Sequence, residues 1–157
     1  MGGYYTCDNF NLKETKYYMK DYYLTTQERQ ARNKIAADTR AMISRVLSIE
    51  DQDESSLMMI YEDYYLQVSF SGVHPLIVIY LAKTFESDIT PKRLRALNDL
   101  NLKSVLGGHA LNQNLGCYSY RATNWLDNPL SEKRFFEILG RCIDEAQRGY
   151  RVISCAA

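Results

Sequence analysis

The stretch LMMIYEDYYLQVSFSGVHPLIVIYL, residues 57–81, decides the fold. Alternate residues of 64–70 are apolar, which is typical of a strand with one buried face. Glu62-Asp63 and Ser71-Gly72 interrupt the runs and predict turns, so three strands follow one another. The last run, 75–82, has no polar face, which favours a strand covered on both sides. The domain's own helices supply one cover, and a partner is a candidate for the other.

Helical patterns lie on both sides of these strands. Thr25 and Glu28 have the spacing of a capping box, and apolar residues recur at helical spacing through 35–49. The acidic stretch 50–54 should follow this helix as a solvated loop. Thr90-Pro91 combines an N-cap hydroxyl with proline at the first helical position and predicts a second helix. Its predicted inner stripe consists of Leu94, Leu97 and Leu100.

The remainder predicts a hairpin and a closing helix. Residues 109–112 should pair with 117–124 around a turn that contains Gly116, and Gly107-Gly108 is read as a turn before them. A helix should open at Pro129 and Ser131 and stop at Gly149. Its predicted buried stripe consists of Phe135, Leu139, Cys142 and Ala146, widened by Phe136, Ile138 and Ile143.

The order of elements, α-β-β-β-α-β-β-α, predicts an α+β fold with a mostly antiparallel sheet and helices packed on it. The chain divides into a tyrosine-rich N-terminal arm (1–24), a single domain (25–149) and a C-terminal tail (150–157). The arm holds six of the 13 tyrosines, interleaved with lysines. Such an arm is expected to be partly ordered, or to pack across the domain or against a second copy.

Composition bounds the function. The 157 residues carry a formal net charge of zero, which argues against nucleic acid or an anionic membrane as the main partner. No apolar run approaches the roughly 18 residues of a membrane span. Residues 1–10 lack a basic region and an apolar core, so no signal peptide is expected. The four cysteines form no CxxC motif, and we expect a cytoplasmic protein with reduced thiols.

Motifs that carry chemistry are missing. His109 and Cys117 are expected to face each other across the hairpin, near Asp127, but no oxyanion loop or nucleophile elbow accompanies them. His74 and His109 have no second ligand at metal-binding spacing, and both are expected at the surface or an edge. We therefore predict no enzyme, no catalytic residue, no metal site and no cofactor.

A small-ligand-binding domain or a small enzyme is the alternative. Its pocket would lie near the 107–125 hairpin and would be lined by His109, Tyr118 and Trp125.

Protein binding is the favoured function, because tyrosine, tryptophan and branched apolar residues are available for an interface. The candidate interface residues are Ile77, Ile79, Leu81, Tyr118, Tyr120 and Trp125.

Residues 90–148 carry a resemblance to a known family. They contain TPKRLRALNDLN, then GGHALNQN, then CYSYRATNWLDNPLSEKRFFEILGRCIDEA. With the order of elements, these segments resemble the type III secretion chaperone-like fold and, within it, the YbjN family of sensory transduction regulators. The strongest matches are Leu97-Asn98-Asp99-Leu100-Asn101 and Leu130-Ser131-Glu132. Unlike those chaperones, which tend to be acidic, this chain is neutral.

The resemblance implies a compact bacterial protein, often a homodimer, with no known catalytic residues. It also implies a chaperone-like or regulatory adaptor that binds an extended segment of an unidentified protein. The dimer contact is left open among the strand 75–82, the helix 91–102 and the arm.

Overall fold

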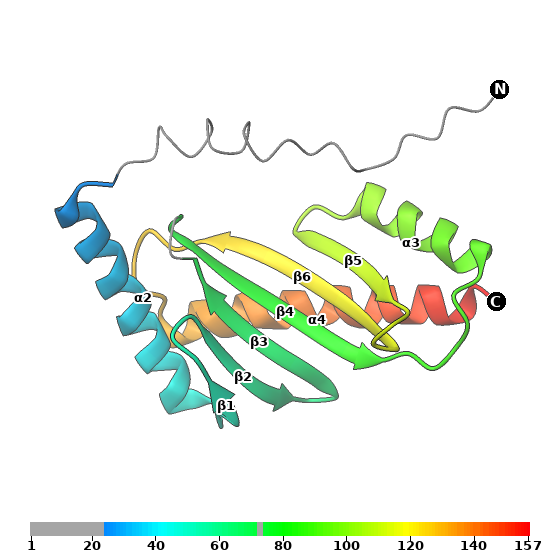
Figure 1. The fold of residues 1–157 in the computed structure, drawn as a ribbon, viewed down its shortest axis with the longest axis horizontal. Helices are drawn as coiled ribbons and strands as arrows, with labels where there is room; N and C mark the ends of the chain where they lie inside the picture. Colours follow the sequence, from blue (N-terminus) through cyan, green and yellow to red (C-terminus); the bar gives the residue numbers. More distant parts are fainter. Residues whose placement is uncertain (1–23, 72–73) are drawn as a thin grey trace.

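The computed structural model describes residues 24–71 and 74–157, which form an α+β domain around an antiparallel sheet (Figure 1). Residues 1–23 of the predicted tyrosine-rich arm (1–24) lie outside the described part. The strands are β1 (Asp51–Gln52), β2 (Ser56–Tyr61), β3 (Tyr64–Phe70), β4 (Leu76–Thr84), β5 (Gly107–Asn112) and β6 (Cys117–Trp125), and the helices are α2 (Thr26–Val46), α3 (Pro91–Lys103) and α4 (Glu132–Cys155).

The sheet has the spatial order β1-β2-β3-β4-β6-β5, and every neighbouring pair is antiparallel. β4 is central and pairs with β6 after the excursion through α3 and β5. The predicted fold class and hairpin are confirmed, but the predicted turn at Gly107-Gly108 is wrong, because these two residues begin β5 and pair with β6. The acidic stretch is also exposed as expected, although Asp51–Gln52 adds a short edge strand beside β2.

Local capping explains where the helices begin. Thr25 accepts a hydrogen bond from the Glu28 backbone at 3.1 Å, while the Glu28 carboxylate accepts from the Thr25 backbone at 2.8 Å. Thr90 and Ser131 each accept a hydrogen bond from the backbone N–H three residues later, of Arg93 and Arg134, at the starts of α3 and α4. All three predicted helix starts are confirmed because each depends on residues adjacent in sequence.

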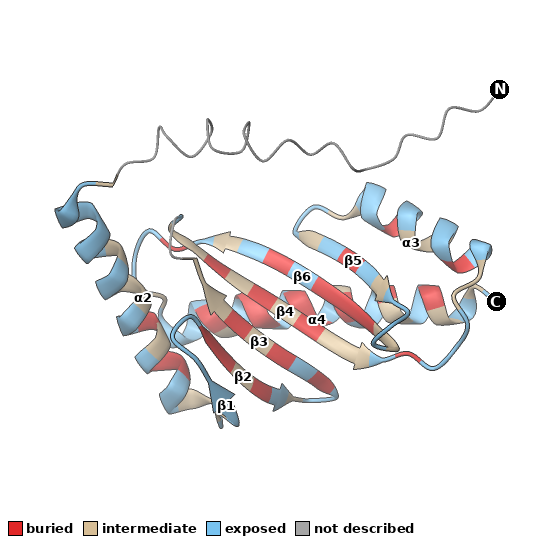
Figure 2. Cartoon of the chain, viewed as in Figure 1, coloured by how far each residue is buried: buried red, intermediate tan, exposed pale blue. Residues whose placement is uncertain are grey.

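The core lies between one face of the sheet and α4, which passes behind the sheet in Figure 1. Alternate residues of β2, β3, β4 and β6 are buried against it, as the red bands in Figure 2 show. The predicted α4 stripe is confirmed, with Phe135, Leu139, Cys142 and Ala146 all buried. Burial raises the pKa of the Cys142 thiol to about 11, so this cysteine stays a neutral apolar filler.

The predicted stop at Gly149 is wrong, because α4 continues to Cys155 and includes most of the expected tail. Gly149 has a packing role instead. A Cβ on this residue would lie 2.5 Å from the Tyr118 hydroxyl oxygen and closer still to His109 Nδ1. Glycine therefore lets α4 approach the rings of β5 and β6.

The predicted inner stripe of α3 is only partly right. Leu100 is buried and Leu97 is half-buried, whereas Leu94 is exposed and Arg93 is buried in its place. The Arg93 guanidinium donates to the carbonyl oxygens of Asp88 at 2.6 Å and Ile153 at 3.3 Å. Since α4 has no basic residue in its last turn, Arg93 complements the negative end of that helix from outside.

Candidate protein-binding surfaces

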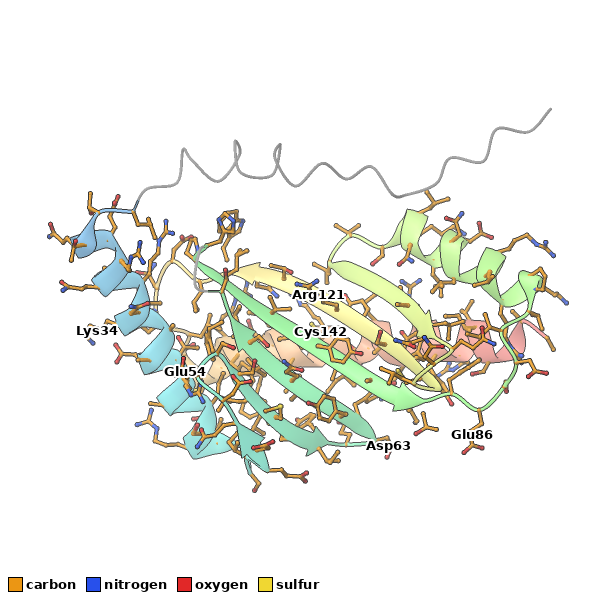
Figure 3. All side chains as sticks on the ribbon, viewed as in Figure 1. Lys34, Glu54, Asp63, Glu86, Arg121 and Cys142 are labelled. Carbon is orange, nitrogen blue, oxygen red and sulfur yellow. The ribbon has the colours of Figure 1, made fainter. Side chains whose placement is uncertain are left out.

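The second face of the sheet carries no helix among the described elements, and we call it the open face. Ile60 is 56% exposed there, and Tyr65, its cross-strand neighbour, is also exposed. Tyr80 on β4 lies in register with Arg121 on β6, which Figure 3 labels. The open face is therefore a mixed surface of aromatic, aliphatic and polar side chains.

β4 differs from its predicted two-sided burial. Its inner residues are fully buried, but Leu76, Val78, Tyr80 and Ala82 on the open face are only half-buried. The chain itself covers one side of this strand. The apolar residues on the other side account for the missing polar face in the sequence.

Five of the six predicted interface residues lie inside the chain's own core. Ile77, Ile79, Leu81, Tyr118 and Tyr120 are fully buried. In this fold they have no surface to offer to a partner, because they belong to the alternation that faces α4. Only the sixth, Trp125, is available, with 69% of its surface exposed beside Leu76 at the end of β6. The period-2 pattern identified apolar strands but did not show which face has a helix on it.

A second apolar surface, the α3–β5 edge, was not predicted from these residues. It consists of Leu94 and Leu102 on α3 and Val105 and Leu106 in the link to β5. Val105 is 93% exposed and Leu102 is 76% exposed. The sequence signal was the apolar pair Val105-Leu106 in a connection where polar residues are usual.

Asn101 fastens α3 to β5. Its side-chain oxygen accepts from the His109 backbone N–H at 2.8 Å, and its amide donates to the His109 carbonyl at 3.0 Å. These two bonds satisfy the outward-facing backbone groups of His109 in the edge strand β5.

His109 is buried rather than at the surface, and a polar network surrounds it. Its Nδ1 lies 2.7 Å from the Tyr118 hydroxyl, which donates to the Ala146 carbonyl at 3.0 Å. Since that hydroxyl has a single proton, Nδ1 carries the proton shared with Tyr118 and Nε2 is the basic nitrogen. Nε2 and the Tyr120 hydroxyl are buried without a hydrogen-bond partner in the described residues. Burial lowers the pKa of His109, and Arg148 lowers it further while Glu145 raises it.

The predicted pairing of His109 with Cys117 is wrong. The register places His109 opposite Tyr120 and Cys117 opposite Asn112, with His109 on the buried face and Cys117 on the open face. The three residues predicted to line the alternative pocket do not come together either, because His109 and Tyr118 are buried while Trp125 is exposed. Tyr118 and Trp125 are seven residues apart on one strand, or about 23 Å, and Tyr118 packs against His109 with ring centroids 6.0 Å apart.

An open groove of about 400 Å³ lies elsewhere, between the β3 and β4 ends and the last turns of α4. Lys83 is its central side chain. Its ammonium lies 3.4 Å from the Asp63 carboxylate and 5.5 and 5.2 Å from the ring centroids of Tyr64 and Tyr150. The lysine is therefore held by the chain's own aromatic rings, as cation–π contacts favour.

Residues 24–71 and 74–157 bring together no group of three His, Cys, Asp or Glu side chains that could hold a metal ion. In the same part of the chain, no helix is both long and apolar enough to span a bilayer.

No protein-family model matches the sequence, and no curated protein matches it. Solved structures do share its fold. A chain of the ExsC–ExsE complex has a TM-score of 0.58 at 12% identity, covering 80% of this chain and 98% of that one. The Yersinia pestis type III secretion chaperone SycH, solved with a fragment of YscM2, has a TM-score of 0.53 at 10% identity, covering 73% of this chain and 98% of that one.

YbjN from E. coli gives a TM-score of 0.49 at 9% identity, covering 73% of this chain and 86% of that one. The ExsC and SycH matches confirm the predicted type III secretion chaperone-like fold. At these identities the similarity concerns the fold alone.

Proposed function

We propose that this chain is a non-enzymatic protein-binding module, chaperone-like or regulatory, that binds an extended segment of another protein. The observation that carries the proposal is the open face, where Ile60, Tyr65 and Trp125 remain exposed while α4 covers the opposite face. Neighbouring structures with this fold are complexes of chaperones with protein partners. Reduced cysteines and neutral charge are in keeping with a cytoplasmic module that binds neither nucleic acid nor membrane.

The alternation of side chains on the open face suits an extended ligand. A peptide lying across the strands, or added beside β2, presents every second side chain to the same surface. β1 pairs with only Leu57 and Met58, so it covers only part of β2. Rows such as Ile60–Tyr65–Ala82 then provide apolar contacts, and polar residues between them set the register.

Peptide selection tests this proposal. A displayed library of random peptides should yield binders of the full-length chain, and the double change Ile60→Ser and Tyr65→Ser should weaken the selected peptides at least tenfold. Leu115→Ser is the matched control, because Leu115 is 72% exposed but lies in the β5–β6 turn. Binding that is equal in both variants, or no selected peptide, would contradict the proposal.

We also propose that the chain works as a homodimer through the α3–β5 edge. The four exposed apolar side chains of this edge are close in sequence, since two are on α3 and two are in the segment that connects α3 to β5. A second copy would therefore bury them together. Of the two such contacts that lie within the described residues, β4 and α3, only α3 has exposed leucines.

Light scattering at fixed concentration tests the dimer. Full-length protein and a 25–157 version should both have twice the chain mass, whereas Val105→Glu with Leu102→Glu should have the single-chain mass. Leu115→Glu is the control and should leave the dimer intact. A dimer lost only on removal of the arm would place the contact there instead, and a monomer throughout would refute the homodimer.

A further inference from the structure

We propose that His109 holds the α3–β5 edge against α4, and that the edge separates from α4 when the buried His109 ring takes up a proton. The proposal deepens the proposed function, because the same edge carries the apolar surface assigned to the second copy. The buried polar network around His109 lies within one copy of the chain, so its response to pH does not depend on dimerisation.

His109 is the only buried residue of β5. This strand is at the edge of the sheet and pairs only with β6. Its backbone is clamped to α3 by Asn101, and its ring contacts Tyr118 and Tyr120, with ring centroids 6.0 and 5.0 Å away. One residue therefore connects β5 to α3 through its backbone and to β6 through its ring.

The proton that charges the His109 ring binds to Nε2. Nδ1 already has a proton that it shares with Tyr118, so the next proton goes to Nε2, which is buried and has no partner in the described residues. Protonation thus creates a charged N–H donor in a site without an acceptor, and such a group is costly to keep buried.

The groups around the ring relieve only part of this cost, because burial remains the largest effect on the pKa of His109. β6 contributes Tyr118 and Tyr120, whose pKa values burial raises, so both stay neutral. α4 contributes Glu145, which favours the charged ring, and Arg148, which opposes it. Cys142, also on α4, influences Tyr120 and is itself kept neutral by burial. α3 contributes the uncharged Asn101.

The opening that exposes the His109 ring at the lowest free energy involves α3 and β5. β5 has little buried surface of its own, and α3 contributes only Arg93 and Leu100 to the buried set. Peripheral units with few buried contacts open at lower free energy than the central strands. Separation of α3 and β5 from α4 therefore hydrates His109 while β1, β2, β3, β4 and β6 stay paired.

The sign follows from linkage. His109 has a folded-state pKa below its ordinary 6.5, so the open state binds the proton first and opening becomes easier as pH falls through 6.5. If the closed ring stays neutral throughout, the opening equilibrium constant rises about tenfold between pH 7.5 and 5.5.

Hydrogen–deuterium exchange of the full chain, corrected for the intrinsic rate at each pH, tests this inference. Peptides spanning 91–112 should lose protection about tenfold from pH 7.5 to 5.5, while peptides from β2 and β3 should not. In His109→Asn, whose amide reaches toward the Tyr118 hydroxyl, the pH response should vanish. His74→Asn is the control, because His74 is exposed and is the other histidine of the chain. A response that persists in His109→Asn, or one spread evenly over the domain, would overturn the inference.

A second measurement keeps the inference testable if His109→Asn does not fold. NMR titration of the His109 Cε1 proton in the unmodified protein should give a pKa below the ordinary value of 6.5. A His109 pKa of 6.5 or higher would overturn the inference. Light scattering at pH 7.5 distinguishes the failure of this inference from the failure of the dimer proposal. A monomer that shows the exchange response refutes only the dimer, and a dimer that lacks the response refutes only the pH-dependent role of His109.

Discussion

Gly149→Ala is the sharpest test of how α4 packs, because the helix contains its own control. A Cβ at Gly149 would lie 2.5 Å from the Tyr118 hydroxyl and closer to His109, whereas a Cβ at Gly140 has no neighbour within 4 Å. Both glycines are interior to α4, so alanine gains the same helix propensity, about 1 kcal/mol, at each. The two substitutions differ only in what the new methyl group meets.

The magnitudes decide the direction. At Gly149 the overpacking costs about 1–3 kcal/mol. Displacing the rings also weakens the His109–Tyr118 hydrogen bond, which is worth about 1 kcal/mol. After the propensity gain, Gly149→Ala should lower the free energy of unfolding by about 1–3 kcal/mol, and Gly140→Ala should raise it by up to about 1 kcal/mol.

Urea denaturation followed by circular dichroism, at one protein concentration, measures both variants. If Gly149→Ala stabilises the protein as much as Gly140→Ala does, the close approach of α4 to β5 and β6 is not a constraint. The reasoning about this glycine would then be refuted.

Two further substitutions test contacts made across the chain and within one helix. Arg93→Met should lower the free energy of unfolding by about 2–3 kcal/mol, because it keeps the apolar stem but leaves buried carbonyls unpaired; the exposed Arg95→Met should stay within about 0.5 kcal/mol, and equal effects in urea denaturation would contradict the capping role. Thr25→Ala should cost about 1 kcal/mol by loss of the capping box. Thr26→Ala is its control, and thermal melts that do not distinguish the two would count against the cap.

Elements whose signals are local were predictable. The starts of α2, α3 and α4 depend on a hydroxyl and the backbone three residues later, and the turn of the β5–β6 hairpin depends on Gly116 with its positive φ. Period-2 alternation likewise identified β3 and its buried residues. In each case the physical cause lies within a few residues, so the sequence displays it directly.

The failures have causes that lie far apart in the chain. Gly149 resembles a helix stop, but its reason is a pair of rings on β5 and β6 some 30–40 residues earlier. Arg93 resembles a solvated residue, but its carbonyl partner at Ile153 is 60 residues away. His109 is buried because α4 covers its strand, which no pattern within the strand reveals.

The candidate interface failed for a related reason. An apolar strand such as β4 shows that both of its faces avoid water, but not which face the chain covers itself. Ile77 and Val78 are both β-branched apolar residues. Only the position of α4 in three dimensions makes Ile77 a core residue and places Val78 on the open face. Trp125, at the end of a strand, escaped this ambiguity.

The Asn101 side chain has a consequence for self-assembly. A sheet can polymerise only through an edge whose backbone groups are unpaired, and β5 is such an edge. By bonding both the N–H and the carbonyl of His109, Asn101 occupies the place of a seventh strand with one amide group. The domain can therefore keep an apolar helix face available for association at this end, while the middle of β5, at His109, is blocked against addition of another strand.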